Sequence, residues 1–125
     1  MLEHFARFAD SPPLHRHTHE DEIFHVLSGT LRFVIHGREV EARAGETLCA
    51  PKQVSHTYRV VSADGARWLT ITAHGQFERF VRTFGWQPFR SGLPDPEGAP
   101  SPEQAAALAA ACRNYGIEIV GPPLL

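Results

Sequence analysis

Residues 13–26 read PLHRHTHEDEIFHV, a pattern that predicts two strands joined by a bend. Side chains two apart on an extended strand point to the same face, so His15 and His17 project together. Glu22 shares its parity with the apolar residues of the run that follows, which places its carboxylate inside the protein. A buried carboxylate is costly unless a cation neutralises it. A bend over residues 18–21 would bring Glu22 back beside the two histidines.

Short runs rich in β-branched and aromatic residues continue from this stretch, separated by turn residues at intervals of about ten residues. They cover residues 23–27, 31–35, 39–42, 47–50, 57–61 and 67–72. Glycines between successive runs favour tight hairpins. Consecutive hairpins without intervening helices predict an all-β antiparallel sandwich or barrel.

The pattern changes after residue 75. Aromatic residues at helical spacing predict a short helix over residues 76–84, and a connector rich in proline and glycine follows over residues 88–102. Ser101 and Gln104 form a capping-box pattern that starts a second helix. Residues 117–120 are a candidate edge strand.

The connector is too short to imply a second domain. We therefore expect one domain of 125 residues, with a β-barrel over residues 1–75. Residues 76–125 would form a helical extension, with the proline-rich tether, packed on the barrel.

Charge and cysteine usage limit the classes of partner. Lys and Arg total 12 and Asp and Glu total 14, so no basic surface for nucleic acid or anionic membrane is expected. No apolar run is long enough to span a membrane, and no secretory signal is visible. Cys49 and Cys112 form no CxxC motif, so we expect free thiols and a cytoplasmic location. Cys49 lies between two apolar residues, which predicts a small core residue.

A fourth polar residue completes a possible metal site. His56, on a neighbouring predicted strand, is the best candidate to join His15, His17 and Glu22. Three imidazoles and one carboxylate suit Fe, Mn, Ni, Cu, Co or Zn, so we expect one divalent transition metal per chain. His19 has the same parity and could join them if its strand ran straight, although its acidic neighbours favour a solvated loop.

The sequence resembles a small single-domain cupin at these residues. His15, Arg16 and His17, then four residues, Glu22, six residues and Gly29 match the first cupin motif. Gly45, five residues and Pro51, with His56 five positions further on, match most of the second motif. This chain departs from the family pattern at three positions that shape turns, where Ala9 and Gln53 replace glycines and Val60 replaces an asparagine.

The resemblance implies a double-stranded β-helix, or jelly-roll barrel, with one or two short C-terminal helices. The chain is similar to quercetin dioxygenase-like cupins. That similarity implies a metal-dependent dioxygenase acting on a small organic substrate such as an aromatic, flavonol or diketone-like compound. Glu22 would act as a catalytic base if it loosened from the metal. The alternatives are a non-catalytic small-ligand-binding cupin and a redox-neutral isomerase, cyclase or decarboxylase.

The N-terminal segment bears on assembly. Residues 2–8 alternate between apolar and polar side chains, which predicts an edge strand or an exchanged strand. Exposed strand edges are commonly covered by pairing, so we expect a homodimer.

Overall fold

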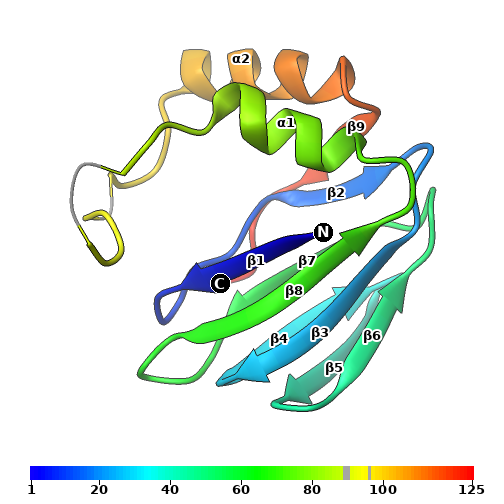
Figure 1. Ribbon diagram of the computed structural model, residues 1–125. Helices are drawn as coiled ribbons and strands as arrows, with labels where there is room; N and C mark the ends of the chain where they lie inside the picture. Colours follow the sequence, from blue (N-terminus) through cyan, green and yellow to red (C-terminus); the bar gives the residue numbers. More distant parts are fainter. Residues whose placement is uncertain (89–90, 96) are drawn as a thin grey trace.

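The computed structural model describes residues 1–88, 91–95 and 97–125 and contains two antiparallel sheets with two helices lying together on one side (Figure 1). The four-stranded sheet has the order β1 (Leu2–Ala6), β8 (Ala66–Thr72), β3 (Glu22–Ser28) and β6 (Thr47–Ala50). The five-stranded sheet has the order β5 (Arg38–Arg43), β4 (Thr30–Ile35), β7 (His56–Val60), β2 (Leu14–His17) and β9 (Ile117–Gly121). The predicted all-β jelly roll with short helices near the C-terminus is confirmed.

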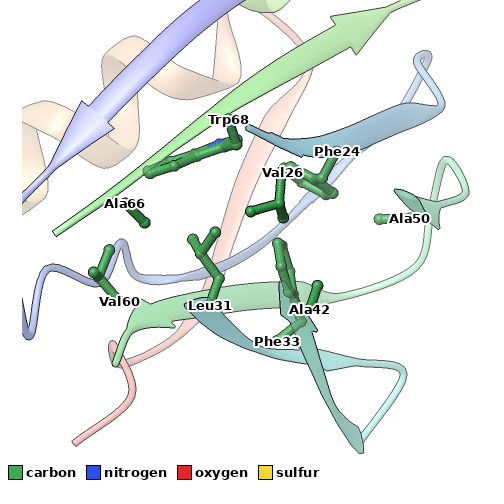
Figure 2. Close-up of a cluster of buried hydrophobic side chains, with 9 residues drawn as sticks. All are labelled: Phe24, Val26, Leu31, Phe33, Ala42, Ala50, Val60, Ala66 and Trp68. Atoms are coloured by element: carbon green, nitrogen blue, oxygen red, sulfur yellow. The ribbon is translucent and has the colours of Figure 1, made fainter. Parts of the chain in front are cut away.

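Strand alternation builds the core between the two sheets. On β3, the side chains of Phe24 and Val26 are buried while that of Ile23 is 37% exposed. Inward-facing residues of both sheets meet in one apolar cluster, which Figure 2 shows: Phe24, Val26, Leu31, Phe33, Ala42, Ala50, Val60, Ala66 and Trp68. Val60, which replaces the asparagine of the family pattern, is thus a core residue.

The structure corrects the expectation for Cys49, because its side chain is exposed. Cys49 lies opposite Ile23 in the pairing of β6 with β3, and Ile23 points outward. Residues directly opposite each other share a face of the sheet, so Cys49 points outward too. Its apolar sequence neighbours, Leu48 and Ala50, take the inward positions on the alternating strand.

Glycine is required where two hairpins approach each other. Gly29, between β3 and β4, has φ 78°, and a Cβ there would overlap the carbonyl oxygen of Gly65. Gly65 lies in the turn that precedes β8. The His36–Gly37 pair turns the chain between β4 and β5 with φ 51° and 73°, as expected for a tight hairpin.

The C-terminal segment returns to the barrel. Helices α1 (Gln76–Phe84) and α2 (Pro102–Arg113) match the predicted ones, and β9 is an edge strand that pairs with β2. Residues 89, 90 and 96 of the predicted connector lie outside the described residues; the described part of residues 88–101 contains neither helix nor strand. Neither helix has the length and apolar character needed to cross a membrane.

Candidate metal centre

Four side chains from three strands converge at one end of the barrel. His15, His17, Glu22 and His56 each offer one ligand atom, and these atoms all lie within 4.8 Å of one another. The side chains of His17, Glu22 and His56 are at most 3% exposed. The two sheets supply different members of the cluster, because the three histidines lie on β2 and β7 and Glu22 lies on β3.

Strand register brings the histidines together. His15 and His17 project to the same face of β2, and their ring centroids are 5.4 Å apart. His56 begins β7 directly opposite His15, at a centroid distance of 4.5 Å. Glu22 begins β3 after the chain bends at Thr18 and His19, within the bend predicted over residues 18–21.

Backbone carbonyls orient two of the rings. Nδ1 of His15 lies 2.7 Å from the carbonyl oxygen of Pro13, and Nδ1 of His56 lies 3.0 Å from that of Val54. A carbonyl oxygen only accepts, so both Nδ1 atoms donate and each Nε2 keeps its lone pair. This partnership commonly orients metal-binding histidines.

Two contacts within the cluster fit a cation. Nε2 of His56 lies 2.7 Å from Oε2 of Glu22, and two acceptor atoms that close need a proton or a cation between them. His17 is 2% exposed, and neither of its ring nitrogens has a hydrogen-bond partner, although its Nε2 lies 3.1 Å from the same carboxylate oxygen. Buried polar atoms without partners are rare in folded proteins and require an explanation. A divalent ion held by the four donors accounts for both contacts.

The protonation states favour ligation near neutral pH. Burial raises the pKa of Glu22, but its interactions with His17 and His56 outweigh burial and leave that pKa below its usual range. Burial, reinforced by the nearby His56, lowers the pKa of His15 to about 4. The site therefore presents a charged carboxylate and a neutral His15 imidazole, the forms that bind metals.

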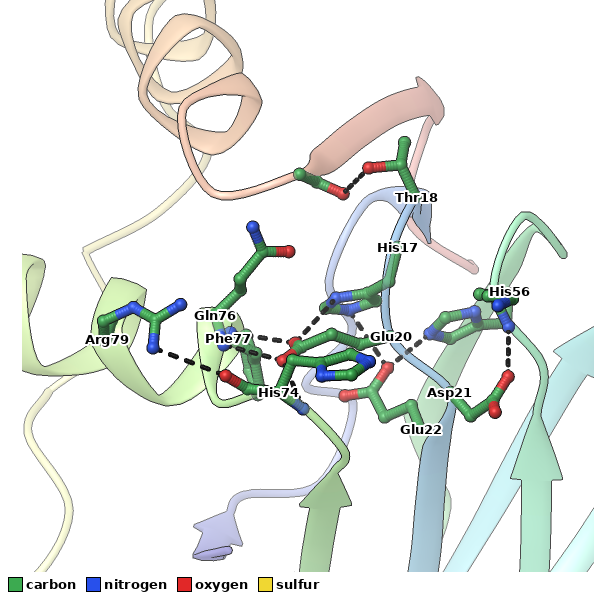
Figure 3. Close-up of polar contacts among 12 residues, drawn as sticks. His17, Thr18, Glu20, Asp21, Glu22, His56, His74, Gln76, Phe77 and Arg79 are labelled. Carbon is green, nitrogen blue, oxygen red and sulfur yellow. Dashed lines mark hydrogen bonds and ion pairs between the residues drawn. The ribbon is translucent and has the colours of Figure 1, made fainter.

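Glu20 has a structural role that the sequence pattern did not reveal. Its carboxylate is buried and accepts hydrogen bonds from the backbone N–H groups of His74, Gln76 and Phe77, at 3.1, 2.7 and 3.1 Å (Figure 3). It thereby caps the first turn of α1, where the Gly75 N-cap has no side chain to do so. Its Oε2 also lies 4.0 Å from Nδ1 of His17. Glu20 thus links the loop between the candidate ligands His17 and Glu22 to α1.

Two of the three departures from the family motifs occur at strained backbone positions. Ala9 and Gln53 have φ 72° and 68°, a left-handed conformation that favours glycine. Gln53 also forms hydrogen bonds to the chain at the end of β2. Its backbone N–H donates to the carbonyl of His17 at 2.7 Å, and its side-chain amide donates to the carbonyl of Thr18 at 3.0 Å. The replacement of glycine by Gln53 therefore adds one side-chain hydrogen bond between the two motif loops.

The remaining histidines in the stretch and beyond it are separate from the cluster. His19 is exposed on the bend, and the four-residue cluster in the described part of the chain does not include it. His25 points away from Glu22 and contacts the hydroxyl of Thr47 at 2.8 Å. His4, on β1, stacks on Trp68 with ring centroids 5.1 Å apart, and burial lowers its pKa.

A cavity of about 190 Å³ adjoins the cluster. His15 and Glu22 form part of its wall, and most of the other lining side chains are apolar or aromatic, among them Phe24, Phe77 and Phe80. Ligand sites in proteins commonly combine an apolar wall with a few polar groups. The arrangement can hold a small organic molecule against His15 and Glu22, two of the four candidate ligands.

Comparisons with known proteins bear on the barrel. The model of the family described as "Cupin domain" matches residues 1–72. Quercetin 2,3-dioxygenase from Bacillus subtilis (strain 168) is 31% identical over 71 residues, which cover 57% of this chain and 21% of that protein. The chain thus spans about a fifth of the length of this relative.

Solved structures share the fold at low sequence identity. A predicted oxalate decarboxylase from Thermotoga maritima is 24% identical, with a TM-score of 0.54 over 56% of this chain and 61% of that one. The polyketide cyclase RemF from Streptomyces resistomycificus is 25% identical, with a TM-score of 0.51 over 56% of this chain and 50% of that one. Both similarities cover little more than half of this chain at low sequence identity, so they support its fold and not an activity.

Proposed function

This chain belongs to the cupin family, and from that premise we propose that it is a metal-dependent enzyme of the dioxygenase type acting on a small organic substrate. One observation carries the proposal: three imidazoles and one carboxylate place their donor atoms within 4.8 Å of one another beside a mostly apolar cavity. The similarity to quercetin 2,3-dioxygenase supports oxygen chemistry over other reactions of such a site.

His15, His17, Glu22 and His56 would hold one divalent ion of Fe, Mn, Ni, Cu, Co or Zn. When bound, a redox-active ion would supply electron transfer between substrate and O₂, and zinc would supply Lewis acidity. The protein's own contribution is to fix the donors through the carbonyls of Pro13 and Val54.

Glu22 has a second role in the proposal, as general base. Its carboxylate lines the cavity and has a pKa below the usual range, so it is charged near neutral pH. A substrate hydroxyl bound in the cavity would transfer its proton to this carboxylate.

The proposal is tested by metal analysis and oxygen uptake. We expect about one equivalent of metal per chain after purification, and oxygen consumption with at least one member of a panel of flavonols, diketones and catechols. His56→Ala should lose most of the metal, and His19→Ala, a matched control on the exposed bend, should keep it. Full metal content in both His56→Ala and His15→Ala would contradict the ligand assignment.

Glu22→Gln separates the two roles of Glu22. The amide keeps one oxygen donor but is a far weaker base, so we expect partial metal retention with loss of turnover. Unchanged turnover at equal metal content would remove the role of base.

A second candidate function is redox-neutral catalysis at the same site. It is favoured by the likeness to a polyketide cyclase and to a predicted oxalate decarboxylase, neither of which is named as a dioxygenase. A bound zinc ion, together with product formation that consumes no oxygen, would favour this candidate. Metal and ligand binding without any product would instead favour a binding protein.

We also propose a homodimer formed through β1. Within the described residues β1 pairs only with β8, so its outer edge is free to pair, and Phe5 on this strand is 48% exposed. Light scattering should give twice the chain mass, and Phe5→Glu should shift the protein toward monomer. A monomer at high protein concentration would contradict this assembly.

A further inference from the structure

The cavity beside the metal centre has walls from two different parts of the chain. The barrel supplies His4, Phe24, Tyr58 and Thr70 together with the candidate ligands His15 and Glu22. The rest of the wall comes from the C-terminal segments α1, α2 and β9, which we call the cap, although β9 also extends the five-stranded sheet beside β2. The cap contributes Phe77, Phe80, Leu108, Cys112, Ile117 and Ile119. The family match ends at residue 72, so the whole cap lies outside it.

We propose that the cap restricts this site to a compact substrate of about one ring. The oxygen atoms of the substrate would face His15 and Glu22, and its apolar part would pack against the cap. The inference rests on the proposed function for the oxygen-binding end, and the cap adds the limit on size and the preference for an apolar body.

The volume of the cavity supports the limit on size. A dry apolar cavity of about 150 Å³ is large enough to bind benzene. The cavity here measures about 190 Å³, which leaves space for one ring with small substituents. A second fused or linked ring needs more space than this volume provides, so we expect a three-ring flavonol not to fit under the cap.

The cap is tied to the barrel at several points, so its position is fixed by contacts beyond the cavity. Glu20 holds the first turn of α1. Thr18 donates two hydrogen bonds to the carbonyl of Gly116, from its N–H at 2.7 Å and from its hydroxyl at 3.0 Å. Moving the cap outward would break buried polar contacts as well as apolar packing, and each broken contact costs free energy.

The two helices of the cap are also braced against each other. Tyr115, which follows α2, packs edge-on against Phe80 at a centroid distance of 5.7 Å. Its hydroxyl donates to the hydroxyl of Thr83 on α1 at 3.1 Å. The Phe80 ring is therefore held from outside while it lines the cavity, and it is the best single position at which to enlarge the site.

The chemistry of the wall favours an aromatic substrate. Rings from Phe24, Tyr58, Phe77 and Phe80 surround the space, and aromatic groups gain from offset or edge-on contacts with one another. The charged and metal-ligating groups lie together on the barrel side. A one-ring compound with an oxygen substituent at one end matches this distribution.

Two probes that differ by one ring test the limit on size. Phenol and 4-phenylphenol share a hydroxyl group, and in an open groove the larger molecule would bind more tightly because it buries more apolar surface. In calorimetric titrations of the metal-loaded protein we expect phenol to bind about tenfold more tightly than 4-phenylphenol. Equal affinity, tighter binding of 4-phenylphenol, or no binding of either probe would overturn the inference.

Substitutions in the cap test its cause. Phe80→Ala should shift the affinity ratio toward 4-phenylphenol by about tenfold, because it removes a ring from the wall. Val81→Ala, an apolar truncation on the same helix that does not line the cavity, should leave the ratio unchanged. Leu108→Ala provides a second enlargement from α2 if Phe80→Ala does not fold. An unchanged ratio in folded Phe80→Ala or Leu108→Ala would overturn the role of the cap.

The same titrations after chelation separate this inference from the proposed function. The cap contains none of the candidate ligands, so the preference for the smaller probe should persist in metal-free protein. A protein that binds no metal but retains the preference would refute the proposed function alone. A protein that binds metal and shows no preference would refute the limit on size alone.

Discussion

The two helices that cover the site begin in different ways. Helix α2 is capped by its own residues, since the hydroxyl of Ser101 accepts from the N–H of Gln104 and the Gln104 side chain accepts from the N–H of Ser101. Helix α1 begins at Gly75 and is capped by Glu20, which lies more than fifty residues earlier in the chain. The residues that cap the N-terminus of α2 are local to that helix and independent of the site. The residue that caps the N-terminus of α1 is part of the loop between the candidate ligands His17 and Glu22.

This difference predicts that α1, but not α2, is coupled to the candidate metal centre. Glu20 contacts α1 through three hydrogen bonds and lies 4.0 Å from His17. Neither residue of the α2 cap contacts a candidate ligand through any hydrogen bond found in the described residues. Substitutions of Glu20, which caps α1, and of Ser101, which caps α2, should therefore differ in their effect on metal affinity as well as on stability.

The largest effect is expected for Glu20→Ala, which leaves three backbone donors at the start of α1 without their acceptor. We expect the free energy of unfolding to fall by about 3 kcal/mol and metal affinity to weaken. Glu20→Gln retains one oxygen acceptor and should lose roughly half as much. Denaturant titration and metal titration measure the two quantities. Wild-type metal affinity in folded Glu20→Ala would break the proposed coupling.

Metal binding should stabilise the protein by a comparable amount. At a free metal concentration a hundredfold above Kd, the expected gain in the free energy of unfolding is about 2.7 kcal/mol. Because Glu20 joins the loop between His17 and Glu22 to α1, metal binding should slow hydrogen exchange at the start of α1 more than at the start of α2. Equal slowing of exchange at both helix starts would contradict a coupling of the site to α1 alone.

Ser101→Ala removes the N-cap side chain of α2 and should lower the free energy of unfolding by about 1 kcal/mol. Metal affinity should remain at the wild-type value, because the lost hydrogen bond lies within α2. Ser91→Ala, an exposed serine in the connector, is the matched control and should change neither quantity. Weakened metal binding in Ser101→Ala would mean that α2 is coupled to the site as well.

The smallest effect is a pH dependence confined to the site. The pKa of His15 is lowered to about 4 in the folded protein, so the unfolded chain binds the proton more readily. Stability of the metal-free protein should therefore fall as pH decreases, by up to about 1 kcal/mol between pH 6.5 and 5.5. His15→Gln should remove this contribution. The cost of Ser101→Ala should be the same at both pH values, because neither Ser101 nor Gln104 ionises.

Much of the site could be predicted because its signals are local. Parity on a strand placed His15 and His17 on one face, and the apolar residues after Glu22 indicated that its carboxylate is buried. His56 required a guess about which strands are neighbours, and the register of β7 with β2 places it opposite His15.

Other features could not be predicted, because they depend on contacts between distant segments. Cys49 points outward because its strand pairs opposite Ile23, and an alternating run does not reveal which of its faces meets the core. Glu20 lies among acidic neighbours typical of a solvated loop, yet it is 1% exposed. The cavity wall formed by α1, α2 and β9 likewise required knowledge of where the C-terminal segment returns.

The amino-acid sequence by itself determined the strand pattern, both helices and the four residue types of the centre, since each depends on spacing within a few residues. Tertiary structure decided how the two sheets face each other, which acidic side chain caps α1, and how much space remains beside the centre. The physical reason is the sequence separation of the interacting residues. Strand and helix geometry repeats every two to four residues, so its pattern can be read directly from the sequence. Register, burial and cavity volume arise only when segments tens of residues apart pack together.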